Sequence, residues 1–388
     1  MPAGTNIYLR LETPVSTTSS HLRDPVKARV VRDVPWSGTP TQIAVPVGAK
    51  LSGTIERLIP SSSPTDRARL RLRFSQLELP GLPAVSVEGH VAEVENARET
   101  VLADGTIRGV LASELPISML EEALDKLKKQ RPDVGDQAKK TSEERLGKSD
   151  TSIEYPAGTD FALVLDKPLE LPRIFPPTVE DTLSSQVNAP VTHLLTEAPQ
   201  RVSGKDGKPG DPLNLVIIGN AEEIRRAFQE GGWVEAEKLT GKSLFETVRA
   251  VMGDKGYGSA PVSQLYLYGR AEDLAFQKML NTFAKRHHLR LWRSSAKAED
   301  GREIWLGAAT HDVGMDVRPG VVSHAIDPEI DKERDKVGAD LAATGRVAVL
   351  CPVTRPNPLS EGMTATGGNW KTDGRLLAIE LKTVNSAQ

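Results

Sequence analysis

The chain has 388 residues, of which 49 are basic and 52 acidic, so its formal net charge at pH 7 is −3. This near balance argues against a bulk polyanion such as nucleic acid as partner, and the length allows two or three domains. Cys351 is the only cysteine, which excludes an intrachain disulfide, and its apolar surroundings predict a buried core thiol. The sequence has no run of 18 apolar residues, so no transmembrane segment is expected in it.

The first part of the chain opens its strand-like segments on a repeated Pro-x-Gly turn. The copies are Pro2-Ala3-Gly4, Pro46-Val47-Gly48 and Pro156-Ala157-Gly158, and alternating apolar residues follow each of them. Proline presets φ and glycine permits positive φ, so each copy predicts a sharp turn before a strand.

Three further strands are predicted between the copies, at Val26–Val31, Ala68–Leu77 and Val85–Glu95. The run RLRLRF, from Arg69 to Phe74, alternates strictly, which predicts a half-buried strand with an arginine-bearing face. That face is expected to be solvated, with a ligand groove as the alternative. Several strands without intervening helices favour a small barrel or sandwich.

The order of these motifs resembles a known structural module. The runs PAGTNIYLRL, DPVKARV, VPVGAKLSGTI and RARLRLRFSQLELPG are similar to the β-domain of TrbI-like conjugation-channel scaffold proteins, over about residues 2–170. This resemblance implies a structural or docking β-module of the cell envelope without chemistry of its own.

A helical insertion interrupts the β-pattern at residues 113–150. Ser118 and Glu121 form a capping box, and an apolar helical face follows it. The charged remainder predicts a mobile loop. No basic and apolar leader follows Met1, so export is expected to depend on a signal absent from this sequence, with a cytoplasmic protein as the alternative.

A Pro-rich linker is predicted at residues 171–212, and residues 213–352 then alternate between strands and helices. This pattern predicts an α+β two-layer sandwich. The domain is predicted to begin with a strand at Leu213–Gly219, a helix capped by Asn220 and Glu223, and a helix at Ser243–Met252. Three strands follow, at Gln264–Tyr268, Leu289–Arg293 and Glu303–Ala308, with a helix after the first of them. The next helix starts at Asp327-Pro328 and turns Ile330, Val337 and Leu341 inward, and a strand at Arg346–Cys351 ends the domain. In the tail 353–388, an edge-like strand at Arg375–Leu381 is expected to return to one of the two sheets.

Arginine and histidine gather around two of these strands, beside aromatic residues. The ligand-binding candidates are Arg270, Arg286, His287, His288, Arg290, Trp292, His311, Asp312, His324 and Asp327. No catalytic residue is identified.

The same region carries a second resemblance. The runs DPLNLVIIGNAEEIRRAFQEGGW, PVSQLYLYGRAEDLAFQK, RHHLRLWR, IWLGAATHD and HAIDPEIDKERD, in this order, resemble the LssY C-terminal domain, at about residues 211–352. The resemblance implies no established catalytic residues. Some relatives carry membrane domains of the lipid-phosphatase type, but this sequence lacks the P-S-G-H motif, so their phosphatase activity is not expected.

Three interpretations of the candidate residues stay open. In the first, the acidic residues Asp312, Asp327, Asp331 and Asp335 pair with Arg286, Arg290 and Arg334 in a buried ion-pair network. In the second, Arg270, Arg286 and Arg290 bind a phosphate or carboxylate. In the third, His324 and Asp327 bind a metal, with one ligand from His287-His288, although no metal motif such as H-E-x-x-H is present.

Two functions follow from these interpretations. The favoured one is a non-enzymatic structural or binding module of the bacterial envelope, periplasmic or secreted, whose partner is another envelope protein or a second copy of the chain. The alternative is a hydrolase-like enzyme or an anion-binding domain. No cofactor is expected.

Overall fold

The computed structural model describes residues 1–36, 39–115, 151–236, 264–278, 285–318, 321–364 and 367–383, without the side chains of 40, 315–318 and 321–324. The chain divides into two compact units, and their described parts are residues 1–176 and 177–383. Among the described residues, no helix has the length and apolar character needed to cross a membrane.

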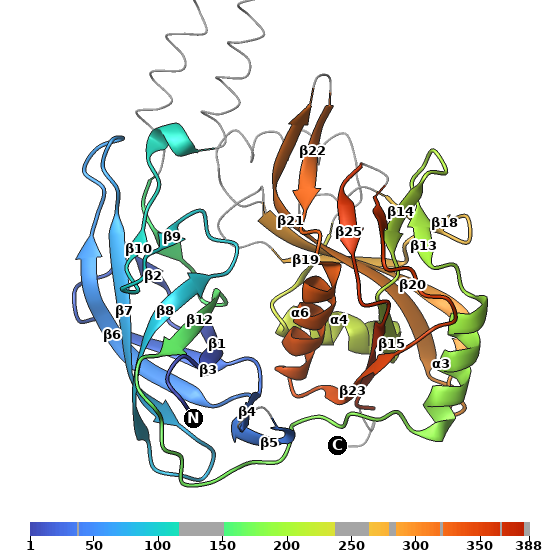
Figure 1. Ribbon diagram of the computed structural model, residues 1–388, viewed down its shortest axis with the longest axis horizontal. Coiled ribbons are helices and arrows are strands. Elements are labelled where there is room, and N and C mark those ends of the chain that lie inside the picture. Colours follow the sequence, from blue (N-terminus) through green and yellow to red (C-terminus); the bar gives the residue numbers. More distant parts are fainter. Residues whose placement is uncertain are drawn as a thin grey trace, which may run out of the picture. The chain divides into compact units, whose positions relative to one another are not determined.

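The first unit is a closed antiparallel β-barrel (Figure 1, blue to green). Six strands pair in the order β6-β3-β1-β12-β8-β7, and β7 pairs back with β6 to close the ring. The strands of this unit are β1 (Asn6–Leu11), β2 (Val15–Ser16), β3 (Pro25–Val30), β4 (Val34–Trp36), β5 (Thr39–Val45), β6 (Lys50–Ile59), β7 (Arg69–Glu78), β8 (Val85–Val94), β9 (Thr100–Val101), β10 (Ile107–Arg108), β11 (Glu154–Tyr155) and β12 (Asp160–Leu165), with a short 3-10 helix at Ala112–Glu114. The prediction of a small barrel is therefore confirmed, whereas the inserted helix falls on residues 116–150, outside the described part.

The repeated turns stand where the barrel strands begin. Gly4, Gly48 and Gly158 have φ of +82°, +86° and +97°, and they precede β1, β6 and β12. This region of φ is open to glycine and strained for other residues, which explains the recurrence of glycine in the motif.

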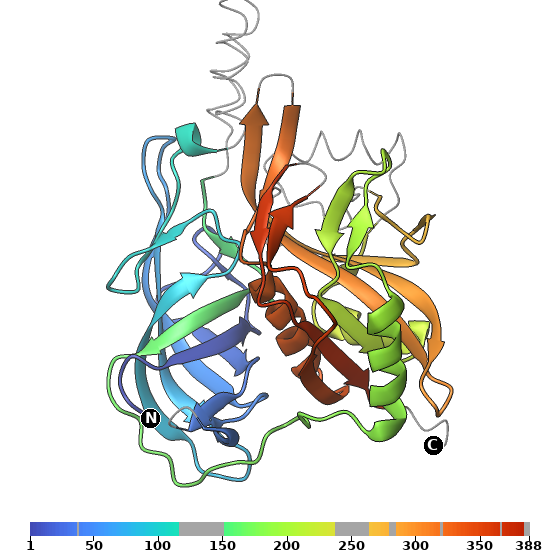
Figure 2. The ribbon, with the colours of Figure 1, turned by 45° about the vertical axis from the view of Figure 1, so that its right-hand side comes forward.

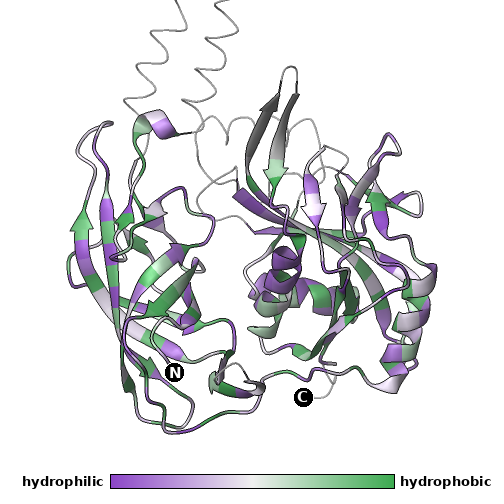
Figure 3. Ribbon diagram, viewed as in Figure 1, coloured by the Kyte–Doolittle hydropathy of each residue, from purple (hydrophilic) through white to green (hydrophobic). Residues whose placement is uncertain are grey.

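Hydrophobic and hydrophilic residues alternate along the barrel strands (Figure 3), and the alternation separates core from solvent. In β7, Leu70, Leu72 and Phe74 are buried in the core. Arg71 and Arg73 lie on the outer side, where both pair with Glu56 of β6. The arginine face of this strand is thus part of an ion-paired surface.

The second unit is built on a mixed sheet with the order β16-β19-β20-β21-β15-β26-β23, and β22 pairs with β21 (Figures 1 and 2). Only the β15–β26 pair is parallel among the described strands of this sheet. The elements are α3 (Ser185–Glu197), β13 (Arg201–Ser203), β14 (Pro209–Pro212), β15 (Leu215–Ile218), α4 (Ala221–Glu230), β16 (Val234–Glu235), β17 (Tyr266–Leu267), β18 (Arg270–Ala271), β19 (Leu274–Lys278), β20 (Lys285–Lys297), β21 (Glu303–Arg318), β22 (Val321–Ile326), α6 (Ile330–Ala342), β23 (Val347–Val353), β24 (Glu361–Met363), β25 (Asn369–Lys371) and β26 (Leu376–Leu381).

Helices cover both faces of this sheet. Helix α3 shares one apolar core with Val216 and Trp292, whereas α4 and α6 share another with Leu215 and Leu291. The predicted two-layer arrangement is therefore corrected to three layers. The additional layer comes from α3, which the sequence analysis places in a linker.

The interval 171–212 is not an extended connector. It contains α3, β13 and β14, and Val187, Val191, Leu194 and Leu195 of α3 are buried. Their spacing makes one apolar helical face, and its burial outweighs the presence of Pro190 inside the helix. Proline content alone therefore predicted the wrong structure.

Two other elements differ from the expectation. Leu274–Lys278 lies in the run predicted as a helix, yet it is strand β19, paired with β20, and all five of its residues are buried. Strand β26 is not an edge strand, because it lies between β15 and β23 with all six residues buried. Continuous burial on both faces removes the alternation on which strand prediction depends.

The helix ends follow the predicted capping in one case and not in the other. Asn220 and Glu223 form the expected capping box of α4. Helix α6 begins at Ile330 rather than at Pro328, because Asp327 N–H donates to the His311 carbonyl and the Pro328 carbonyl accepts from Lys371. The predicted inward residues of α6 are buried, and so is Cys351, whose thiol pKa is raised by burial. The predicted helix at 243–252 lies outside the described residues.

Candidate functional site

Strand β20 sends its neighbouring polar residues to opposite faces of the sheet. Successive side chains of a strand alternate in direction, and Trp292 belongs to the core on the α3 side whereas Leu289 and Leu291 belong to the core on the α4–α6 side. His288 therefore lies on the first face and His287 on the second. The candidate residues form two clusters and not one.

The first group, here called the ion-pair cluster, consists of Arg286, His288, Arg290, Asp211 and Asp312. His288 Nε2 lies 2.6 Å from Asp312 Oδ2, and the Arg286 guanidinium lies 3.7 Å from the same oxygen. Arg290 lies 3.8 Å from the Asp211 carboxylate. All five residues are buried, so two guanidinium groups are matched by two carboxyl groups away from water.

Burial is the largest influence on the pKa values of His288, Arg286 and Asp211 in this cluster. It lowers the pKa of His288 to about 4, against the opposing effect of Asp312, and it lowers the pKa of Arg286. It also raises the pKa of Asp211, which Arg290 partly offsets. At neutral pH His288 is an uncharged imidazole that donates its Nε2 proton to Asp312.

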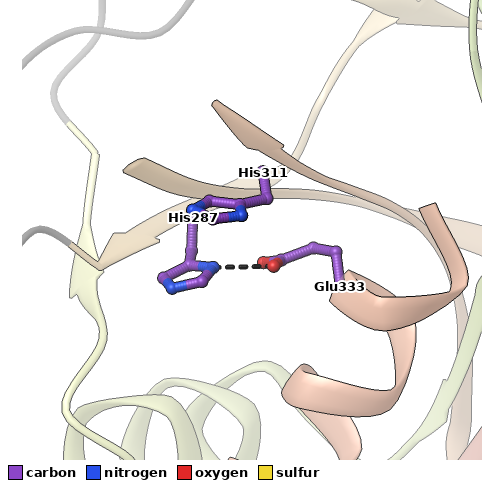
Figure 4. A group of neighbouring side chains, drawn as sticks. All are labelled: His287, His311 and Glu333. Atoms are coloured by element: carbon purple, nitrogen blue, oxygen red, sulfur yellow. Dashed lines mark hydrogen bonds and ion pairs between the residues drawn. The ribbon is translucent and has the colours of Figure 1, made fainter. Parts of the chain in front are cut away.

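The second group, here called the histidine cluster, consists of His287, His311 and Glu333 (Figure 4). His287 and His311 stand opposite each other on β20 and β21, and their rings stack with centroids 4.3 Å apart. Glu333 extends from α6 toward His287, and its Oε2 lies 2.6 Å from His287 Nδ1. One donor atom from each residue lies within 4.8 Å of the other two.

The position of α6 explains how a carboxylate reaches the sheet. Glu333, Val337 and Asp340 follow one another at helical spacing, and all three are buried. Gly338 allows close packing here, because a Cβ at this position would lie 2.4 Å from Leu377 of β26.

A lysine pair adjoins the histidine cluster. Lys278 stands opposite His287 on β19, and its ammonium lies 3.2 Å from Asp340. Asp340 also accepts from Lys336 at 2.7 Å and from the Trp233 indole at 2.9 Å. The Asp340 carboxylate thus accepts from three donors, and the two lysines bring positive charge to this part of the α4–α6 face.

The two histidines of the histidine cluster differ in burial. His287 is 2% exposed and Glu333 3%, whereas His311 is half-buried. Partial burial and the neighbouring His287 lower the pKa of His311 to about 3. His311 is therefore a neutral imidazole at physiological pH, which is the form that binds metals.

Arg270 and Asp327 belong to neither cluster. Arg270 of β18 pairs with Asp273 at 2.6 Å on the surface, so it does not join Arg286 and Arg290 in an anion site. Asp327 pairs with Lys332 at 3.3 Å and not with an arginine. His324 stands opposite Met315 in the β21–β22 ladder, and its side chain lies outside the described part.

Several partners were not predicted. Glu333, Lys278, Asp340 and Asp211 were absent from the candidates, although they complete the contacts of both faces. One signal was available in the sequence: Glu333 lies three residues after Ile330 and four before Val337, on the inward face of the predicted helix. A carboxylate at such a position needs a partner.

The network interpretation from the sequence assigned some pairs differently. Arg290 pairs with Asp211, and Arg334 pairs with Asp331, Asp335 and Asp373. The second set of contacts connects α6 to the turn before β26, and it is separate from the ion-pair cluster.

Comparison with known proteins bears on the second unit alone. No curated protein matches the chain. No finding supports the TrbI-like resemblance of the barrel, which stays a prediction. Residues 195–376, which include both clusters, match the family model described as the LssY C-terminus.

Proposed function

We propose that the chain is a non-enzymatic structural or binding module, in which the ion-pair cluster stabilises the second unit. One observation carries the proposal. Arg286, His288 and Arg290 are each buried and each lie beside a carboxylate. Buried charges in this arrangement satisfy one another, which is the role of a network within a core.

A catalytic site makes a different demand. Its acid, base and stabilising groups must converge on one point that a substrate atom can occupy. A surface pocket in the described part is lined by Gln200, Asn214, Arg355 and Arg375 among others, and it contains none of the candidate residues. Its position gives no support to the hydrolase alternative.

Arg290→Ala tests the proposal. The variant leaves Asp211 buried without its partner at 3.8 Å, so its free energy of unfolding should fall by about 3–5 kcal/mol. Purified parent protein should not hydrolyse phosphoester or peptide substrates above the level of the folded variant. A parent that turns over such a substrate, with a variant that is inactive and equally stable, would establish the enzyme interpretation instead.

We further propose that this module works in the bacterial envelope, with another envelope protein or a second copy as partner. The support is the resemblance of the barrel motifs to a conjugation-channel scaffold domain, in a chain whose first unit is a closed barrel. Fractionation of the native cells tests the location. The protein should be recovered from the periplasmic or membrane fraction, and recovery in the cytosol alone would refute it.

A further inference from the structure

We propose that His287, His311 and Glu333 form a binding site for a divalent transition metal ion, with Zn²⁺ as the preferred ion. The inference goes beyond the proposed function and rests on other residues, those on the α4–α6 face of the sheet. It stands or falls independently of what the ion-pair cluster does.

The donor set fits this class of ion. Two imidazoles and one carboxylate are a ligand set typical of zinc sites that keep a fourth position for water, and nitrogen donors favour zinc over magnesium or calcium. The three side chains come from three different elements, β20, β21 and α6, which are packed on one another. Such a scaffold holds donors in place before an ion arrives.

The distances permit coordination after a small adjustment. The donor atoms lie within 4.8 Å of one another. Zinc bonds of about 2.0–2.2 Å in a tetrahedron place donors roughly 3.3–3.6 Å apart, so the widest separation must close by at most roughly 1.2–1.5 Å. The contact of 2.6 Å between His287 Nδ1 and Glu333 Oε2 is shorter than that spacing. An ion bound by these two atoms takes the place of the proton between them, and that proton leaves to solvent.

An ion must also be able to reach the histidine cluster and tolerate the charges around it. His311 is half-buried, so an ion can reach the cluster from its side, while His287 and Glu333 are covered. Lys278 and Lys336 oppose a cation, and Asp340 neutralises one of these two charges. The competing arrangement is a His287–Glu333 ion pair that needs no metal, and binding measurements separate the two.

The test is a titration of tag-free, chelator-treated protein with Zn²⁺ by calorimetry, followed by visible absorption of the Co²⁺ form. The parent should bind one ion per chain, and bound Co²⁺ should show the absorption of a nitrogen- and oxygen-ligated centre. His311→Ala and Glu333→Gln should each weaken binding by about 100-fold or more, because each removes a ligand. The half-buried position of His311 makes it the ligand whose loss the fold tolerates best.

His288→Gln is the matched control. It removes a buried, carboxylate-paired histidine from the same strand, one residue away and on the opposite face. Its affinity for Zn²⁺ should equal that of the parent. The proposal is overturned if the parent binds no Zn²⁺ more tightly than His311→Ala does, or if His288→Gln loses binding to the same degree as the ligand variants.

Discussion

The two faces of strand β20 treat adjacent histidines differently. His288 lies among guanidinium and carboxylate groups, where every positive charge has a negative neighbour. His287 lies against a second imidazole and one carboxylate, with donor atoms gathered around a common point. The first arrangement is already neutralised by protein groups, whereas the second offers a set of ligands. A dense run of polar residues in a strand therefore lies in two different environments, one on each face of the sheet, and the residues of each face must be interpreted separately.

The largest effect should follow from removal of the carboxylate at the centre of the ion-pair cluster. Asp312→Ala removes the carboxylate that lies beside the buried Arg286 guanidinium and takes the acceptor from His288. The free energy of unfolding should fall by about 3–5 kcal/mol, measured by urea denaturation at pH 7. Asp327→Ala is the control, because its carboxylate pairs with the exposed Lys332 and accepts the Glu329 N–H, and loss of these two contacts should cost about 1–2 kcal/mol. Equal losses in the two variants would show that burial does not distinguish them.

The pH dependence of stability should single out His288. Its folded pKa is about 4 and its ordinary value 6.5, so the unfolded chain takes up the proton first as the pH falls. The stabilising contribution is complete above pH 6.5 and is lost as the pH falls toward 4, with about 2 kcal/mol lost by pH 5. Urea denaturation at pH 7 and pH 5 measures this loss. His288→Gln should lack this part of the loss, and an unchanged difference between the two pH values would contradict the assignment.

The smallest effect should come from Arg270, which the sequence analysis grouped with Arg286 and Arg290 as a candidate anion site. Its side chain is 42% exposed and its partner Asp273 is 31% exposed. An exposed pair of this kind contributes about 0–1 kcal/mol. Arg270→Ala should therefore change the midpoint of urea denaturation little. A loss of stability as large as that of Asp312→Ala would show that Arg270 belongs to the ion-pair cluster.

The sequence predicted features that local chemistry determines. The Pro-x-Gly turns, the alternation of β7 and the capping box of α4 all depend on a few neighbouring residues. Features that depend on tertiary burial were missed. All residues of strand β19 are buried, so its sequence shows no alternation of apolar and polar residues. Helix α3 contains a proline, but the burial of its apolar face stabilises the helix despite it.

The candidate site shows the same difference between features that depend on neighbouring residues and features that depend on tertiary contacts. Arg286, His287, His288, His311 and Asp312 were identified from density and residue type. Their separation onto two faces was available from the period of two along a strand. The contacts with Asp211 and Glu333 were not, because β14 and α6 meet β20 only in the folded chain. Sequence distance gave no indication of which carboxylate meets which cation.

The most direct test of the two-face account is imidazole NMR of histidine-labelled protein, with and without Zn²⁺. The resonances of His287 and His311 should change on addition of one equivalent, because both supply ligands. The resonances of His288 should keep the pattern of a neutral imidazole with its proton on Nε2, since Asp312 Oδ2 lies 2.6 Å from that nitrogen and accepts its proton. A spectrum in which His288 changes together with His287, or in which none of the three responds to Zn²⁺, would contradict the account.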